Sequence, residues 1–335
     1  MTGHTGTVFC AVYTPDGQKI VSSSFDRSVK IWNAANAMAR VSGHTARLLG
    51  SCFFSSKLIV TAARDKTLKV WTADKQEELA TLAGHRSNVF ACDVTPDGQY
   101  ILSASRDSTL KLWQTSNCMP VQSFEGHTAA VNTVALSPDG KIFVSGSDDK
   151  TLKIWNTSGG LVTSIEAHKE AVRGVAFTQD GRRFASASED KVAKLWDAKT
   201  YTLIATMSGH TKPLRCCCFS PDGSRLLVGD EGHYVYEWNT KNAKLMDKWK
   251  KHTATITALS YSIDGKYIFT ASTDGMILML DAKTKEELCV HTCRGRVTTI
   301  SVCKTKSDSR LVAGDGSGNW YLLALQSRQN GLVQK

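Results

Sequence analysis

Short apolar segments alternate with polar turns along nearly the whole chain. In the stretch that follows His127, apolar segments at 131–136, 143–147 and 152–155 are separated by Pro138-Asp139-Gly140 and a second polar turn. A fourth apolar segment, such as 121–124, precedes each new unit. Asp-Gly pairs between apolar runs favour tight hairpins, because Gly readily adopts positive φ. The pattern predicts a four-stranded antiparallel meander in each unit and does not fit helices.

The pattern repeats with a period of 40 to 42 residues. It is marked by a histidine after Gly, Ala or Lys, at His4, His44, His85, His127, His168, His210 and His252. A fixed period of this length is typical of repeat architectures. Another strand pattern begins near residue 294 without a Gly-His pair. We therefore expect a single domain over 1–335, with units starting near 3, 43, 84, 126, 167, 209, 251 and 294.

Polar residues recur at fixed distances within these units. An aspartate follows the histidine by 22 residues in five units and by 21 in one, and a Ser or Thr lies four residues before it. In the sixth unit Gly232 and Val228 replace the aspartate and the hydroxyl together. Joint loss indicates a hydrogen-bonded set, because a buried polar group left without its partner costs about 1–3 kcal/mol.

These residues, together with Trp196-Asp197, resemble the WD40 family of β-propellers, and the resemblance covers essentially the whole chain. It implies an all-β propeller of four-stranded antiparallel blades, with a His, Ser/Thr, Asp and Trp network in each. We expect eight blades, with seven blades and a packed extra element as the alternative. The network positions of the first five units are His4, Ser22, Asp26, Trp32, His44, Thr61, Asp65, Trp71, His85, Ser103, Asp107, Trp113, His127, Ser145, Asp149, Trp155, His168, Ser186, Asp190 and Trp196. Unit seven has Leu280 in place of Trp, so blades six and seven are expected to be looser.

The recurring Ser, His and Asp could be taken for a hydrolase triad. The set recurs in five units, and no enzyme needs five copies of one nucleophile, so we expect no catalytic residue and no enzymatic activity. Cys289, His291, Cys293 and Cys303 lack the spacing of a zinc knuckle. No metal site and no cofactor are therefore assigned.

The net charge and the absence of targeting patterns bear on the expected partners and location of the protein. The chain of 335 residues has a formal net charge of +10, which favours acidic partners. It contains no apolar run long enough for a membrane helix, and residues 1–6 have no signal-peptide pattern. We expect a cytoplasmic protein with reduced cysteines, and a nuclear location stays open.

The resemblance implies a non-catalytic scaffold that binds peptide segments of partner proteins on the propeller rim. In this family, residues just before the aspartates and just after the Gly-His turns lie on that rim. Units two and three carry four arginines and no acid there, whereas units four to six carry acids. We therefore expect acidic or phosphorylated segments across blades two and three. The binding candidates are Phe25, Arg47, Arg64, Arg86, Asn88, Phe90, Arg106, Asp148, Lys169, Arg173 and Glu189.

Two alternative functions stay open. The net charge also suits an RNA-associated propeller, although interleaved aromatic residues of a base-stacking surface are missing. Residues 311–323 resemble terminal repeats of large NACHT-type ATPases, so the chain could be the sensor propeller of such an assembly.

Overall fold

The computed structural model describes residues 58–72, 78–262 and 264–292, and elsewhere only strands. Every regular element in the described part is a β-strand, and no helix there is long and apolar enough to cross a membrane. The strands pair only with sequence neighbours and form seven four-stranded sheets and one three-stranded sheet. This confirms the predicted all-β fold of antiparallel meanders. We call the sheets blades one to eight in chain order.

The strands of the first four blades are short and regular. They are β1 (Val8–Tyr13), β2 (Lys19–Ser24), β3 (Ser28–Asn33), β4 (Met38–Ser42), β5 (Leu48–Phe53), β6 (Leu58–Ala63), β7 (Thr67–Thr72), β8 (Glu78–Ala83), β9 (Val89–Val94), β10 (Tyr100–Ser105), β11 (Leu110–Gln114), β12 (Pro120–Phe124), β13 (Val131–Leu136), β14 (Ile142–Ser147), β15 (Leu152–Asn156) and β16 (Leu161–Ile165).

The remaining blades continue the same meander. Their strands are β17 (Val172–Phe177), β18 (Arg183–Ser188), β19 (Ala193–Asp197), β20 (Leu203–Met207), β21 (Leu214–Phe219), β22 (Arg225–Asp230), β23 (Val235–Asn239), β24 (Leu245–Trp249), β25 (Ile256–Tyr261), β26 (Tyr267–Ser272), β27 (Met276–Asp281), β28 (Glu287–Thr292), β29 (Val297–Val302), β30 (Arg310–Asp315) and β31 (Trp320–Ala324).

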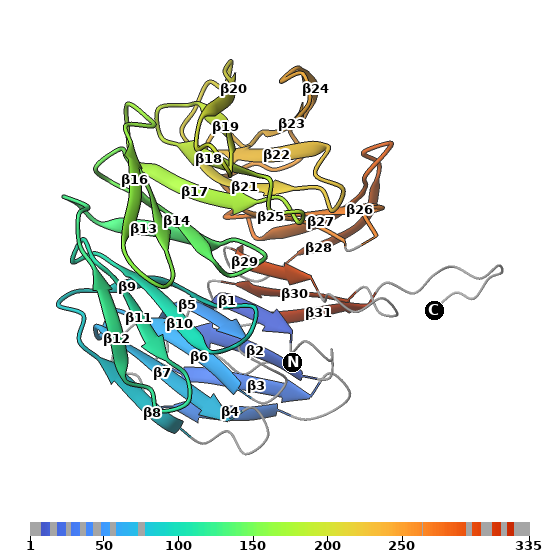
Figure 1. Ribbon diagram of the computed structural model, residues 1–335. Helices are drawn as coiled ribbons and strands as arrows, with labels where there is room; N and C mark the ends of the chain where they lie inside the picture. The colour runs from blue at the N-terminus through green and yellow to red at the C-terminus, as the bar shows by residue number, and fades with distance from the viewer. Residues whose placement is uncertain are drawn as a thin grey trace.

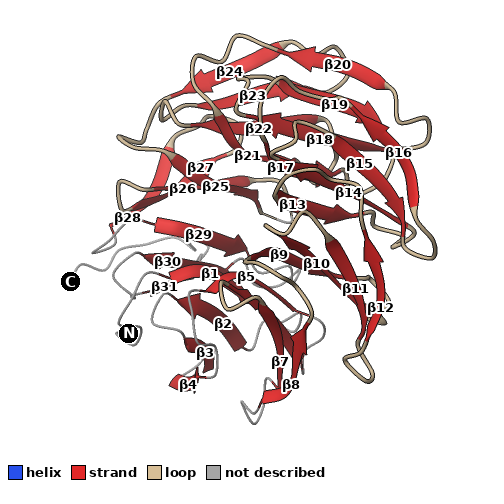
Figure 2. Ribbon diagram, turned by 90° about the vertical axis from the view of Figure 1, so that its left-hand side faces the viewer, coloured by secondary structure: helices blue, strands red, loops and turns tan. Residues whose placement is uncertain are grey.

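The first strands of the blades lie side by side around a ring. Each contacts the first strand of the next blade, and β29 of the last blade contacts β1. The red last sheet accordingly lies beside the blue first sheet (Figure 1). The fourth strands, such as β12, β16 and β20, lie at the periphery (Figure 2). The number of blades stays a prediction, because the chain beyond Ala324 lies outside the described residues.

The apolar core lies between neighbouring blades. One cluster joins Leu195 and Met207 of blade five to Leu214 and Leu226 of blade six, and similar clusters join the other described pairs. The second strands are buried on both faces, whereas the fourth strands alternate between exposed and covered positions. Burial of apolar surface between sheets is therefore what holds consecutive blades together.

The predicted Asp-Gly hairpins occur in the described blades. Gly140 has a φ of 70°, and its amide donates to the carbonyl of Ser137 at 2.8 Å. A Cβ at this position would lie 2.9 Å from Cδ of Pro96, so both the backbone conformation and the close approach require glycine.

Candidate interaction surface

Blade four contains a continuous chain of hydrogen bonds built from the recurring polar residues. Nε1 of Trp155 donates to Oγ of Ser145 at 2.8 Å, and that oxygen lies 2.8 Å from Nε2 of His127. Nδ1 of His127 lies 2.7 Å from Oδ2 of Asp149. The carboxylate accepts from Nδ1–H, so Nε2 is free to accept from the serine. This series of hydrogen bonds ties the second and third strands of the blade to the loop that precedes its first strand.

The same three contacts occur in blades three and five. Nδ1 of the histidine lies 2.9 Å from the aspartate in both blades, and Nε2 lies 2.8 Å from the serine. The tryptophan donates to that serine at 2.9 Å in blade three and at 3.0 Å in blade five. The residues are His85, Ser103, Asp107 and Trp113, and then His168, Ser186, Asp190 and Trp196.

The network positions of the first two units fall mostly outside the described side chains. In blade two, the carboxylate of Asp65 accepts from the amide and hydroxyl of Thr67 at 3.1 and 2.7 Å. The other candidates there lie outside the described residues or side chains: His4, Ser22, Asp26, Trp32, His44, Thr61 and Trp71.

The network holds its carboxylates in the ionised form. Burial raises the pKa of Asp190, but hydrogen bonds from His168 and from backbone amides outweigh burial and lower that pKa to about 2. Burial also raises the pKa of Asp107 and of Asp149. The hydrogen bonds from His85 to Asp107 and from His127 to Asp149 outweigh this effect, so both pKa values lie well below the usual range. Each aspartate therefore stays a charged acceptor at neutral pH.

The Ser-His-Asp geometry resembles that of a hydrolase triad but has no access for a substrate. Ser145 is fully buried, and its oxygen already accepts from Trp155 and contacts His127. A nucleophile must reach a substrate carbonyl and stand beside an oxyanion site. The arrangement is consistent with a structural role in each blade.

Blades six and seven depart from the network to different degrees. In blade seven, Nδ1 of His252 lies 2.9 Å from Asp274 and Nε2 lies 2.8 Å from Thr270. In blade six, Nδ1 of His210 donates to the carbonyl of Lys191 at 2.9 Å, and Nε2 has no partner in the described part. Nε1 of Trp238 likewise has no hydrogen-bond partner among the described residues. Of the two blades, only blade six leaves Nε2 of its histidine without a hydrogen bond within the described residues.

Three rim arginines of blades two and three are exposed. Arg64, Arg86 and Arg106 have no side-chain ion pair or hydrogen bond within the described residues. The amide of Arg106 donates to the carbonyl of Asn88 at 2.8 Å, which places the loop before Asp107 against the start of β9. Phe90, on the same strand, is half-buried. Phe25 and Arg47 lie outside the described side chains.

The acids on the rim of blades four to six are paired with arginines. Arg173 lies 3.2 Å from Asp148 and 2.7 Å from Glu189. Arg215 lies 3.3 Å from Glu189 and also pairs with Glu231. Acids and arginines therefore alternate along this part of the rim, from Asp148 to Glu231, and neutralise one another. The acids expected in units four to six are present, but their pairing with Arg173 and Arg215 was not foreseen.

Arg215 was missed among the rim residues. It occupies the second position of β21, as Arg173 does in β17. Comparing these two positions in the sequence, rather than only the residues next to the turns, could have found it. Lys169, the remaining candidate, is exposed, and its amide donates to Asp190 at 2.9 Å.

Nothing in the described residues brings together three or more His, Cys, Asp or Glu side chains that could hold a metal ion. The described cysteines are free thiols. Burial raises the pKa of Cys217 to about 12, so this thiol stays protonated and behaves as a small apolar side chain.

Family models match most of the chain. The WDHD1 first WD40 domain matches residues 3–261, and the TEP-1 C-terminal beta-propeller matches residues 252–325. A computationally designed protein, Ika8, superposes with a TM-score of 0.85 at 24% identity, covering 96% of this chain and 98% of the other. At that identity the likeness shows the fold alone.

Curated relatives match over shorter segments. Transcription initiation factor TFIID subunit 5 of Caenorhabditis elegans is 31% identical over 102 residues, which is 30% of this chain and 16% of the relative. Protein hir1 of Schizosaccharomyces pombe is 29% identical over 30% of this chain and 13% of the relative. WD40 repeat-containing protein HOS15 of Arabidopsis thaliana is 30% identical over 30% of this chain and 18% of the relative.

The matched segments thus make up less than a fifth of each of these relatives. The match to residues 3–261, the antiparallel blades and the repeated His, Ser, Asp and Trp contacts agree with one another. The chain belongs to the WD40-repeat family of β-propellers.

Proposed function

We propose that the protein is a non-catalytic scaffold whose blades two and three bind acidic or phosphorylated segments of partner proteins. WD40 propellers generally act as protein-interaction scaffolds, and the finer specificity rests on the rim arginines. Arg64, Arg86 and Arg106 are exposed and without acid partners in the described part, whereas Arg173 and Arg215 are each paired with two acids. That difference is the observation that carries the proposal.

Unpaired arginines suit this role for a physical reason. A guanidinium presents a planar fork of donors that matches a carboxylate or phosphate in two parallel hydrogen bonds. Arg173 and Arg215 already use these donors within the rim, so a partner would have to break their ion pairs. Arg64, Arg86 and Arg106 lose only water, and the formal charge of +10 adds long-range attraction for acidic segments.

The test is a charge reversal on the rim. The double variant Arg64→Glu with Arg106→Glu should lose partners that the parent captures from a native cell extract, as measured by mass spectrometry. A matched control, Arg182→Glu with Lys199→Glu, changes the net charge equally at the other end of the blades. It should keep those partners. Capture should also weaken as salt rises, because exposed charges are screened.

Both variants should melt within a few degrees of the parent, since all four side chains are at the surface. If the rim variant retains the same partners as the parent, blades two and three are not the docking site. A loss shared equally by the control would instead mean that only the net charge matters, and this result would also contradict the proposal.

A further inference from the structure

An arginine fills the groove between blades five and six at the end of the propeller opposite the rim. Arg183 is the first residue of β18. Its Nη2 donates to the carbonyl of Gly223 at 3.0 Å, and its Nη1 donates to the carbonyl of Thr240 at 3.3 Å. Both carbonyls belong to turns of blade six. The guanidinium therefore closes this groove by binding the neighbouring blade.

The next groove, between blades six and seven, is built differently. Arg225 occupies the same position at the start of β22, but its Nη1 donates to Oε1 of Glu237 at 2.9 Å, inside its own blade. Glu237 is only 2% exposed and also binds Nζ of Lys285 at 2.7 Å and the hydroxyl of Tyr261 at 3.2 Å. A buried acid thus draws Arg225 away from blade seven.

The acid is specific to blade six among the fully described blades. In the third strand, the position of Glu237 is apolar in blades three, four, five and seven, at Leu112, Ile154, Leu195 and Met279. A buried carboxylate needs partners, because removing it from water costs several kcal/mol. Arg225 and Lys285 supply them, and the groove that Arg225 would otherwise fill stays open.

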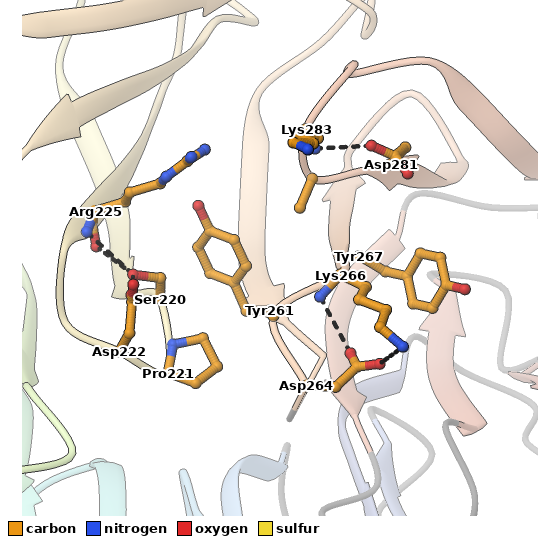
Figure 3. Close-up of a pocket in the computed structure, with 12 residues that line it drawn as sticks. Ser220, Pro221, Asp222, Arg225, Tyr261, Asp264, Lys266, Tyr267, Asp281 and Lys283 are labelled. Carbon is orange, nitrogen blue, oxygen red and sulfur yellow. Dashed lines mark hydrogen bonds and ion pairs between the residues drawn. The ribbon is translucent and has the colours of Figure 1, made fainter.

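The open groove is a pocket of about 430 Å³ between blades six and seven. Residues from three turns line it: 220–222 with Arg225, Tyr261 with 264–267, and 281–283. Figure 3 shows the guanidinium of Arg225, the ring of Tyr261 and Lys283 around the same space. These turns join first to second and third to fourth strands, so the pocket lies at the opposite end from the rim arginines.

The aspartates of this pocket are already engaged in the turns. Asp222 accepts from Ser220 and Ser224, and Asp264 accepts from Ser262 and Lys266. Asp281 accepts from the amides of Lys283 and Thr284 at 2.8 Å. The acceptors of the pocket are therefore largely used by the chain itself.

Arg225 and Lys283, in contrast, keep hydrogen-bond donors that the described residues do not use. Arg225 uses one of its guanidinium nitrogens, for Glu237, and its side chain is 34% exposed. The amine of Lys283 is exposed and has no partner in the described part of the chain. An occupant that supplies acceptors satisfies the remaining donors of Arg225 and the amine of Lys283, whereas a basic occupant would be repelled by the unpaired amine of Lys283.

We propose that this pocket binds an acidic side chain of a peptide segment, with its carboxylate between Arg225 and Lys283 and its aliphatic part against the ring of Tyr261. The hydrogen bond to Glu237 fixes the guanidinium at the pocket wall, which reduces the entropy lost on binding. The pocket suits a carboxylate better than a phosphate, because three lining aspartates repel a doubly charged group more strongly. The site is separate from the rim surface and goes beyond the proposed function.

The chain supplies a matched control for the test. Lys283 lies in the sequence Asp281-Ala282-Lys283-Thr284, and blade five carries the same four residues at 197–200, with Lys199 in place of Lys283. Both lysines are exposed at corresponding turns. Lys199 does not line the pocket. Replacing either lysine by glutamate therefore changes the net charge equally, but only the change at Lys283 lies in the pocket.

The experiment pans a random peptide library on the intact chain and removes peptides that still bind the Lys283→Glu variant. The remaining peptides should share an Asp or Glu. Replacing that acid by Asn or Gln, or using Lys283→Glu, should each weaken binding about tenfold in fluorescence anisotropy. Lys199→Glu and the rim variant Arg64→Glu with Arg106→Glu should bind as the parent does, so the result is independent of the rim proposal.

Two results would overturn the assignment. One is that no peptide class depends on Lys283, or that Lys283-dependent peptides bind equally well after their acid is neutralised. The other is that a phosphoserine in place of the acid binds more tightly than the carboxylate. Because the Lys283 side chain is exposed and makes no hydrogen bond or ion pair within the described residues, its variant should melt with the parent and report on binding alone.

Discussion

Blades four and six share a histidine and a tryptophan but differ in how these residues are satisfied. In blade four, Ser145 joins Nε2 of His127 to Nε1 of Trp155. In blade six, Val228 stands at the position of that serine, and Nε2 of His210 and Nε1 of Trp238 are buried without hydrogen-bond partners among the described residues. One hydroxyl therefore decides whether two buried donors or acceptors are satisfied.

Blade six compensates with aromatic and charged contacts of its own. The ring of His210 packs edge-on against Tyr236 with centroids 4.4 Å apart. The hydroxyl of Tyr236 donates to buried Asp230 at 3.3 Å, and Nζ of Lys248 lies 5.0 Å from the Tyr236 ring centroid. Such contacts stabilise a ring without pairing its nitrogens. The comparison indicates that the repeat tolerates loss of the network where packing replaces it.

The largest difference should come from removing the histidines. His127→Ala removes two hydrogen bonds inside the blade, one to Ser145 and one to Asp149, whereas His210→Ala removes a single hydrogen bond, to the carbonyl of Lys191. Both variants lose similar ring packing against a tryptophan. We expect His127→Ala to lower the free energy of unfolding by about 1–3 kcal/mol more than His210→Ala does. Equal losses in urea titrations would contradict the network assignment.

The next effect is a dependence of the free energy of unfolding on pH, which comes from His210 in blade six. Burial lowers the pKa of His210 from 6.5 to about 4, and the positive charge of Lys248 acts in the same direction. Between these values the unfolded chain binds a proton that the folded protein does not, so stability falls as the pH drops from 6.5 toward 4. The loss attributable to His210 should be about 2 kcal/mol at pH 5.

The measurement is the free energy of unfolding across this range for the parent and for His210→Gln, which cannot titrate there. Burial also lowers the pKa of His252, so the parent keeps a slope that the variant shares. The difference between the two curves isolates His210. Parallel curves from pH 7 to pH 4 would mean that His210 is protonated as easily in the folded protein as in the unfolded chain.

The smallest and most specific effect is the exchange of one hydroxyl between blades. Val228→Thr keeps the side-chain shape and gives Trp238 and His210 the oxygen that Thr270 gives His252 in blade seven. We expect a gain of about 1 kcal/mol in the free energy of unfolding. The reverse change, Thr270→Val, should cost about 1 kcal/mol or more. A loss of stability in both variants would show that blade six has no room for the hydroxyl.

The sequence was sufficient to predict the fold and the contacts within a blade. The histidine, serine and aspartate of one network lie within 22 residues, and their order follows from strand register. The sequence did not predict the ion pairs of Arg173 and Arg215 with Asp148, Glu189 and Glu231. Two of these pairs, Arg173 with Asp148 and Arg215 with Glu189, join residues of consecutive blades, and they depend on the packing of one sheet against the next.

The periodic pattern of apolar strands, Asp-Gly turns and recurring polar residues by itself determined an all-β WD40 propeller, because these signals act over a few residues and repeat in every unit. Only the tertiary structure decided which charges face a partner. Arg183 and Arg225 occupy the same position in the repeat, yet one fills a groove and the other leaves a pocket. The cause is the carboxylate of Glu237. It becomes buried only when the strands pack, and a buried carboxylate needs hydrogen-bond and ion-pair partners.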